Sequence, residues 1–406
     1  MPLLKRVMCI AVFLPVLAIA GQKSDQLSFV KAWASGSAER TAIANAGIAI
    51  DSVLSDSVTF VARSADLRRL SEKGIAFEST PLPERNDFPS QDSAYHNYAE
   101  IGAELDALAH QYPALVKRVT IGKSFEGRDV VGVRVSSSSL EDSLPSALFI
   151  GCHHAREHLS VEVPLKLADH LAAGYMSDPR IKKLLDTREV WIIPMLNPDG
   201  AEYDVADGAY HYWRKNRRVN SDGTLGVDLN RNYAKNFGGS GSSSFPSSDI
   251  YHGPSAFSEP ETAAVRDFVR ARKFATVLLS FHTYSELILW PWSHTDDPIP
   301  NERDRAVFET MGKKMATWNA YKPQKSSDLY LASGDTTDWA YDELKIFAFT
   351  FELSPGDMFG GGFYPGAAAI EPTFKANIEP ALYLIEKAEN PYSVLGNFPD
   401  PLGIIP

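Results

Sequence analysis

The chain has 406 residues, of which 44% are hydrophobic and 22% are charged, a composition typical of globular proteins with one large or several ordinary domains. The net charge of −11 at pH 7 argues against a nucleic-acid partner, since binding a polyanion requires a basic face. We therefore expect a globular protein that does not bind nucleic acid.

The first residues have the pattern of a secretory signal peptide. Lys5 and Arg6 precede an apolar run over residues 7–19 that is too short to span a bilayer, and the run ends in a small-x-small cleavage site. No later stretch is long and apolar enough to cross a membrane. We expect residues 1–20 to be removed and the protein to be secreted, to the medium or the periplasm, without a membrane partner.

Residues 21–86 differ from the rest of the chain. Residues 56–64 alternate like a strand, residues 64–74 have helical spacing, and residues 75–80 form a second short strand. A stretch rich in proline and polar residues follows, which predicts an exposed linker with Arg85 as a protease target. Two interpretations remain, a propeptide or a small accessory domain that stays attached, and we favour the propeptide.

From Asp87 onward, helical and strand patterns alternate, and several strands are apolar on both faces. Such strands suit a sheet covered by helices on both sides. We predict one α/β domain over residues 87–406, with a mixed, mostly parallel twisted sheet, preceded by a small α+β prosegment. The expected helices are 98–111, 160–173, 261–272 and 373–389, and the expected strands are 116–122, 130–136, 147–152, 189–196, 274–282 and 346–353.

The motif HHAREH at residues 153–158 concentrates metal-ligand chemistry after a predicted strand. As H-x-x-E-H, it would make His154 and His158 metal ligands and Glu157 the general base. As H-x-x-E, it would make His154 and Glu157 the ligands and leave the base elsewhere. The motif alone leaves both interpretations open.

Two further polar residues stand at the ends of predicted apolar strands, where α/β sheets collect their sites. His282 ends the strand 274–282 and is a candidate for a remote third zinc ligand. Glu352 interrupts the very apolar strand 346–353, where a buried carboxylate is costly without a role. Glu352 is therefore either a general base or one partner of a structural ion pair.

Two arginine-rich pieces, WRKNRR at 213–218 and DLNRN at 228–232, follow an NPDG turn. They form either a solvated basic loop or an anion-recognition site, because arginine binds carboxylates in a bidentate manner. The Gly- and Ser-rich stretch 238–248 is expected to be a flexible surface loop.

On these residues the chain resembles the zinc metallocarboxypeptidases, the funnelins related to carboxypeptidases A and B. The matching pieces are HHAREH, NPDG, WRKNR, GVDLNRNY, YHGPSAFSEPET, SFHTYSELILWPW, YLASGDTTDW and FTFEL, in the family's order over about residues 93–390. DFPSQDSAYHNY, GKSFEGRDV and NPYSVLG resemble the bacterial carboxypeptidase T branch, in which DFPS begins the mature enzyme. Activation near Asn86–Asp87 is thereby implied.

The resemblance implies a role for each candidate residue and selects the H-x-x-E interpretation of the motif. His153 and His158 then become supporting or packing residues. The implied zinc ligands are His154, Glu157 and His282; the general base is Glu352; the oxyanion stabiliser is Arg214; the residues that hold the substrate's terminal carboxylate are Asn230, Arg231 and Tyr330; and those lining neighbouring subsites are Arg156 and Tyr284.

The implied activity is that of a secreted carboxypeptidase with one Zn²⁺ per catalytic domain, a water activated there and Glu352 as base. Its expected partners are peptide or protein C-termini and its own prosegment, and we expect a monomer. The resemblance also allows structural Ca²⁺ but identifies no ligands for it. A cell-wall peptide hydrolase and a non-catalytic zinc protein are the competing hypotheses, which the full set of catalytic residues disfavours.

Specificity rests on the segment SGDTTDW. Family alignment puts Asp335 near the floor of the pocket for the terminal side chain, where it would attract Lys or Arg; alternatively it forms a local turn. Thr337, Ser293 and Lys325 also stand near this pocket, and Lys325 would either favour acidic side chains or point outward. We expect mixed specificity for apolar and basic C-terminal residues.

Overall fold

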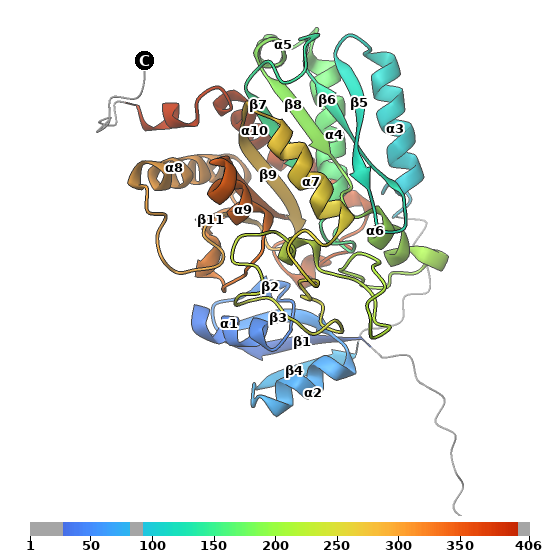
Figure 1. Ribbon diagram of the computed structural model, residues 1–406, viewed down its shortest axis with the longest axis vertical. Coiled ribbons are helices and arrows are strands. Elements are labelled where there is room, and N and C mark those ends of the chain that lie inside the picture. The colour runs from blue at the N-terminus through green and yellow to red at the C-terminus, as the bar shows by residue number, and fades with distance from the viewer. Residues whose placement is uncertain (1–26, 82–91, 397–406) are drawn as a thin grey trace, which may run out of the picture.

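The computed structural model describes residues 27–81 and 92–396 (Figure 1). The predicted signal peptide, the Arg85 target and the Asn86–Asp87 junction lie outside the described residues. Within them the chain forms two sheets, a small one near the N-terminus and a large one that makes up most of the molecule. No helix in the described part of the chain is both long and apolar enough to span a bilayer.

Residues 28–81 form what we call the N-terminal lobe, a four-stranded antiparallel sheet with two helices. Alternate residues of its first strand are buried, and Val30, Phe60 and Leu70 lie in its core. The predicted strand, helix and strand after residue 56 are confirmed. The elements are β1 (Ser28–Trp33), α1 (Ser37–Asn45), β2 (Ser52–Val53), β3 (Ser57–Ala62), α2 (Ser64–Glu72) and β4 (Phe77–Pro81), in the sheet order β2-β3-β1-β4.

The large sheet has eight strands in the order β11-β10-β12-β9-β7-β8-β6-β5. Its four central strands, β12, β9, β7 and β8, are mutually parallel, while β10, β6 and β5 join by antiparallel pairs. The strands are β5 (Val116–Lys123), β6 (Asp129–Val135), β7 (Ser146–Ile150), β8 (Glu189–Ile193), β9 (Ala275–Thr283), β10 (Leu287–Trp290), β11 (Lys322–Lys325) and β12 (Phe347–Leu353).

Helices cover both faces of this sheet, which confirms the predicted α/β class. One face packs against α3, α4, α5, α8 and α10, and the other against α7 and α9, so successive strand residues enter different cores. The helices are α3 (Tyr98–Gln111), α4 (Leu159–Gly174), α5 (Pro179–Thr187), α6 (Pro198–Asp204), α7 (Pro260–Ala271), α8 (Glu302–Asn319), α9 (Thr336–Leu344) and α10 (Ile370–Lys387).

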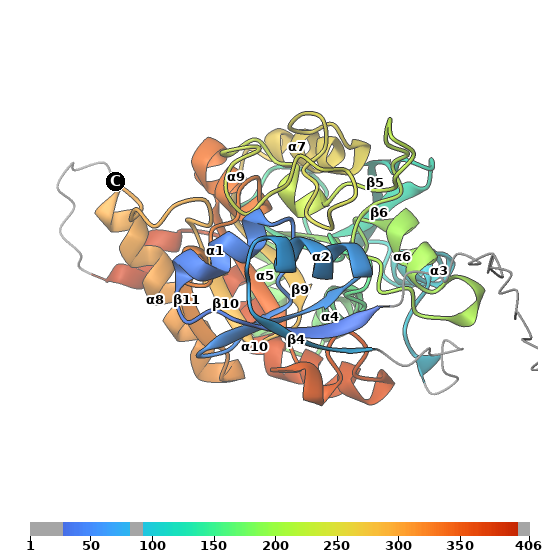
Figure 2. The same ribbon diagram turned by 90° about the horizontal axis from the view of Figure 1, so that it is seen from below.

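The carboxyl ends of the parallel strands meet at the edge of the sheet that faces the N-terminal lobe (Figures 1 and 2). The motif at 153–158 follows β7, and His282 lies near the end of β9. Glu352 of β12 is the register partner of His282 on β9. The parallel strands thus bring the motif at 153–158, His282 and Glu352 to the same end of the sheet, beside the lobe.

Candidate active site

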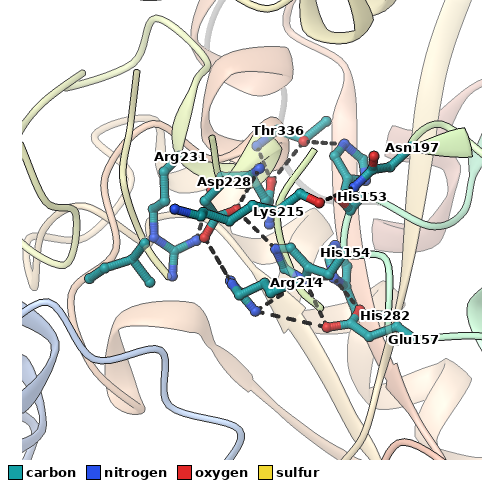
Figure 3. Close-up of polar contacts among 12 residues, drawn as sticks. His153, His154, Glu157, Asn197, Arg214, Lys215, Asp228, Arg231, His282 and Thr336 are labelled. Carbon is teal, nitrogen blue, oxygen red and sulfur yellow. Dashed lines mark hydrogen bonds and ion pairs between the residues drawn. The ribbon is translucent and has the colours of Figure 1, made fainter. Parts of the chain in front are cut away.

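Three side chains meet at the ends of β7 and β9, namely His154, Glu157 and His282 (Figure 3). His154 Nδ1 lies 2.7 Å from Glu157 Oε1, and His282 Nδ1 lies 3.0 Å from Glu157 Oε2. The two Nδ1 atoms are 3.1 Å apart. All three residues are buried, so the structure brings the predicted local pair and the remote histidine to one point.

The surroundings of the two imidazoles suit a bound metal. His154 Nδ1 faces the cluster, and its Nε2 lies 3.1 Å from the carboxylate of Asp228. With a metal bound at Nδ1, Nε2 would carry the proton and donate it to Asp228. His282 Nε2 is likewise held, 3.0 Å from Ser280 Oγ. Two imidazole nitrogens and a carboxylate are ligands that zinc accepts, and a partner on the second ring nitrogen is the usual way of orienting them.

A guanidinium, that of Arg214, lies beside this cluster. Arg214 donates from Nε and Nη2 to Oδ2 of Asp228, at 3.0 and 2.9 Å, and its Nη1 lies 3.9 Å from Glu157 Oε1. Burial alone would raise the pKa of Asp228, but Arg214 and His154 outweigh burial and hold that pKa well below its usual value. Asp228 therefore stays ionised and fixes both an imidazole and the guanidinium.

Arg231 and Asn230 lie in a short 3₁₀ turn, Leu229–Arg231, close to Asp228. Arg231 donates from Nε to the carbonyl of Gly241 at 2.8 Å and from Nη1 to the carbonyl of Asn230 at 2.7 Å. Gly241 has a positive φ, and a Cβ there would collide with the Leu331 carbonyl. The loop 238–248 contains no helix or strand, as expected of a loop. It nevertheless belongs to the site, because the carbonyl of Gly241 orients Arg231.

Glu352 is only partly buried, and its side chain lines the cleft next to the metal cluster. Burial, and then the nearby Glu157, raise the pKa of Glu352 well above its ordinary value. The sequence predicted that a carboxylate so placed has a role. Its position on the cleft wall favours a chemical role over a structural ion pair, since the described contacts give it no cationic side-chain partner within ion-pair distance.

Arg156 and Tyr284 both contact Phe363, which lines the cleft. The Arg156 guanidinium lies 4.2 Å from the centre of the Phe363 ring, and Tyr284 packs edge-on against the same ring. Arg156 Nη2 also donates to Oδ1 of Asp51 at 2.7 Å, an ion pair in which both side chains are almost completely buried. Asp51 belongs to the N-terminal lobe, so this lobe engages a residue that the sequence assigned to substrate.

A second hollow adjoins the cluster and is lined by residues from β10, β12 and the segment 326–335. Asp335 lies there as the N-cap of α9, accepting from the amide of Asp338 at 2.8 Å. Its other oxygen accepts from Ser293 Oγ at 3.0 Å and Thr337 Oγ1 at 2.9 Å. Burial, and then Asp338, raise the pKa of Asp335 to about 7. The structure thus shows Asp335 as the cap of α9 and as a lining residue of this hollow, while its part in binding the terminal side chain stays a prediction.

Tyr330 lines both hollows, together with Asn230, Arg231 and Glu352. Lys325 does not line either, and its Nζ donates to the carbonyl of Asp296 at the surface, so it points outward.

Each hollow has a free volume of only about 50 Å³, and Ile50 and Asp51 of the N-terminal lobe close one of them. Pockets for small organic ligands usually measure several hundred Å³. The lobe therefore fills the space above the cluster. It is held there by further contacts at both ends of the cleft: Thr41 Oγ1 accepts from Leu331 N at 2.9 Å, Asn45 Oδ1 from Gly241 N at 2.7 Å, and Asp249 pairs with Arg63 at 3.1 Å.

The sequence did not single out three residues that matter to this geometry, Asp228, Phe363 and Asp51. Asp228 stood inside the quoted DLNRN, and an acidic residue beside two arginines was a usable signal for a partner. Phe363 lies in a glycine-rich loop without periodicity, and Asp51 precedes a two-residue strand, so nothing local distinguished either. His153 has the supporting position expected of it, with Nε2 2.9 Å from Tyr233 Oη.

Comparison with known sequences gives one family. The family model described as zinc carboxypeptidase matches residues 101–380. A zinc carboxypeptidase from Saccharothrix mutabilis subsp. capreolus is 35% identical over 387 residues, covering 88% of this chain and 89% of that protein. Carboxypeptidase A2 from Rattus norvegicus is 36% identical over 285 residues, covering 69% of this chain and 67% of that protein.

Solved structures show the same fold. The thrombin activatable fibrinolysis inhibitor superposes with a TM-score of 0.73 and 26% identity, covering 90% of this chain and all of that one. Carboxypeptidase A from Helicoverpa armigera superposes with a TM-score of 0.76 and 23% identity, covering 90% of this chain and 98% of that one. Both alignments cover more of the chain than residues 92–396 alone make up, so they extend into the N-terminal lobe.

Proposed function

The chain belongs to the zinc carboxypeptidase family, whose members hydrolyse C-terminal peptide bonds, and from that premise we propose that it is a secreted, prosegment-regulated carboxypeptidase of mixed specificity. The observation that carries the proposal is the convergence of His154, Glu157 and His282 beside Arg231 and Glu352 in one cleft. The enzyme class follows from the family, while the residue roles, the specificity and the prosegment are our proposals.

His154, Glu157 and His282 are the residues that would hold zinc, and their donor atoms suit it. When bound there, zinc would polarise the scissile carbonyl and lower the pKa of a water ligand towards about 7. Asp228 and Ser280 keep the two imidazoles turned towards the metal.

Glu352 acts as general base and acid. Its raised pKa suits a group that removes a proton from the attacking water and later delivers it to the leaving amine. Arg214 stabilises the negative oxygen that develops on the carbonyl, an interaction worth about 3 kcal/mol for one well-placed donor. Asp228 holds this guanidinium rigidly, so no reorganisation is needed during the reaction.

Arg231, Asn230 and Tyr330 bind the terminal carboxylate of the substrate. The contacts of Arg231 to two backbone carbonyls support this role, because they fix its plane and leave Nη2 for a bound anion. An internal peptide bond at this place would leave the guanidinium without a partner. The cost of that unpaired charge makes the enzyme an exopeptidase.

The hollow at Asp335 receives the terminal side chain. Leu289, Leu329 and Ala332 line this hollow together with the carboxyl of Asp335. This mixed lining supports acceptance of both apolar and basic terminal side chains. Arg156, Tyr284 and Phe363 contact the residues that precede the scissile bond.

The N-terminal lobe acts as an inhibitory prosegment until the chain between residues 81 and 92 is cut. Two observations support this role: the lobe closes the cleft with Ile50 and Asp51, and it pairs Asp51 with Arg156. Secretion rests on the signal-peptide pattern of residues 1–20.

The test compares the full chain before and after limited proteolysis, with peptides ending in Phe, Leu, Arg, Lys or Glu. We expect cleavage only after proteolysis, loss of activity with a chelator and its return with zinc. Amidated peptides should resist. Hydrolysis of muropeptides but not of ordinary peptides would favour the cell-wall hypothesis instead, and cleavage after Glu alone would contradict the specificity.

A further inference from the structure

The mechanism above does not use the buried carboxylate of Asp204, the last residue of α6. Burying a carboxylate is costly unless hydrogen bonds satisfy its oxygens. Its Oδ1 accepts from the backbone amide of Trp213 at 2.6 Å. Its Oδ2 lies 2.9 Å from His158 Nε2, and the Tyr364 hydroxyl donates to it at 2.8 Å.

Each of these partners is the covalent neighbour of a residue in the cleft. Trp213 precedes Arg214, His158 follows Glu157, and Tyr364 follows Phe363. Asp204 itself does not line the cleft. It therefore joins three segments, each of which supplies one group to the site.

The contact to Trp213 is the strongest link to the chemistry. The amide of Trp213 is held by Asp204, and the carbonyl of Arg214 accepts from the amide of Ala155 at 3.0 Å. The backbone on both sides of the Arg214 side chain is thus anchored, one side by Asp204 and the other by the metal-ligand loop. A shift of about 1 Å in a catalytic group can cost about 100-fold in rate.

The contact to Tyr364 acts on Phe363, which lines the cleft. Tyr364 stacks on Tyr210 with ring centres 3.7 Å apart, and its hydroxyl is directed at Asp204. Phe363, the next residue back, carries the contacts to Arg156 and Tyr284. Fixing Tyr364 therefore fixes the wall that contacts the peptide before the scissile bond.

We propose that Asp204 is a positioning residue for this reaction, setting Arg214 through the Trp213 amide and Phe363 through the Tyr364 hydroxyl. The proposal rests on the proposed function and deepens it. His158, its third partner, is not in the metal cluster, so the role does not require any change in metal binding.

The experiment compares Asp204→Asn and Tyr364→Phe in the full chain after cleavage of the linker. Asparagine keeps the shape but loses the negative charge and one acceptor oxygen, so the charge-assisted hydrogen bonds to Trp213, His158 and Tyr364 are weakened. We expect Asp204→Asn to lower kcat about 10- to 100-fold and also to raise KM. Tyr364→Phe releases only the Phe363 wall, and we expect KM to rise about 3- to 10-fold with kcat little changed.

A matched control is Asp304→Asn. Asp304 is also a buried aspartate, and it accepts from the hydroxyls of Tyr341 and Tyr392, both at 2.7 Å, away from the cleft. We expect its replacement to lower Tm and leave kcat and KM unchanged. Zinc content, measured by elemental analysis, should equal that of the parent chain in all three variants.

Parental kcat and KM in Asp204→Asn, or loss of zinc from it, would overturn the proposal. Should Asp204→Asn fail to fold, Tyr364→Phe decides, because parental KM there would overturn the proposal as well. An inactive parent chain would instead count against the proposed function. In that case the rate of amide hydrogen exchange at residues 213–214 still tests the anchoring. The exchange should be faster in Asp204→Asn than in the parent chain and unchanged in Asp304→Asn.

Discussion

The two ends of the cleft each contain a buried carboxylate, and their surroundings give them opposite behaviour. Glu157 lies between His154 and His282, and these two groups outweigh the effect of burial, so the pKa of Glu157 is held below its ordinary value. Asp335 meets two hydroxyls, one amide and a second carboxyl group, and its pKa is raised to about 7. At the end of the cleft around Glu157, which we call the metal end, the surroundings keep the carboxylate ionised. At the end around Asp335, which we call the pocket end, the ionisation of the carboxyl changes with pH.

The difference matches the task that the proposed function gives to each end. A metal ligand must be ionised whenever the site is loaded, so cationic and neutral nitrogen groups surround it. A pocket that accepts both apolar and basic side chains binds each better if its carboxyl is neutral beside an apolar side chain and ionised beside a basic one. Substitutions at the metal end should therefore abolish turnover, whereas those at the pocket end should only change preference.

The largest effect is expected at Glu352, which stands between the two ends. Glu352→Gln keeps the size of the side chain but cannot take the proton of the attacking water, so kcat should fall by about 10³-fold. The measurement is kcat on a peptide ending in Phe, together with zinc content, which should not change. A loss of less than about tenfold with zinc retained would contradict the role of Glu352 as base.

Arg231 comes next, because in the proposed function it separates exopeptidase from endopeptidase activity. Arg231→Ala should lower kcat/KM about 10²- to 10³-fold for peptides with a free carboxylate, since a buried charge pair with substrate is lost. Activity on the amidated peptide, however low, should not fall. Arg217→Ala is the matched control, because Arg217 belongs to a neighbouring basic stretch but stacks on Tyr203, 3.7 Å from its ring centre. An equal loss in both variants would argue against a specific role for Arg231.

The N-terminal lobe contacts the metal end through Asp51 and the pocket end through Thr41, so one variant at each contact can be compared. Asp51→Asn removes a buried ion pair at the metal end and leaves the Arg156 guanidinium with a weaker partner. Activity of the uncleaved chain should rise about tenfold, and the linker should be cut faster by added protease.

Thr41→Val is the counterpart at the pocket end, where it removes only the acceptor for Leu331 N. Its effect should be smaller, because one neutral hydrogen bond contributes about 1 kcal/mol. If neither variant changes the activity of the uncleaved chain, the lobe is not held in the way that we propose.

The smallest effect is a pH dependence of preference at Asp335. Below pH 7 this carboxyl is mostly protonated, and above pH 7 it is mostly ionised, so only the higher pH favours a cationic guest. Between pH 6 and pH 8 the ratio of kcat/KM for peptides ending in Arg to those ending in Phe should rise about 3- to 9-fold. Asp335→Asn should make that ratio lower and independent of pH. A flat ratio in the parent chain would remove Asp335 from the specificity pocket.

Much of the fold could be predicted because its signals are local. The helix Tyr98–Gln111 and the buried strands around β7, β9 and β12 follow from apolar periodicity. The long helix α8 was missed, although Val307, Met311 and Met315 recur at helical spacing after the cap Asn301. β11 is the opposite case, since its four residues, KPQK, contain no strand signal and pair with β10 only through tertiary contacts.

By itself the sequence placed a candidate metal site in the motif at residues 153–158, and the resemblance to the family selected His154 and Glu157 as its local pair. It also supplied an isolated carboxylate in an apolar strand, Glu352, at a position where a carboxylate without a role would be costly. Only the tertiary structure decided which distant groups complete the site. Asp228 reaches His154 across 74 residues, and Asp51 reaches Arg156 across 105. Such pairings depend on the order and register of strands, which no local pattern contains.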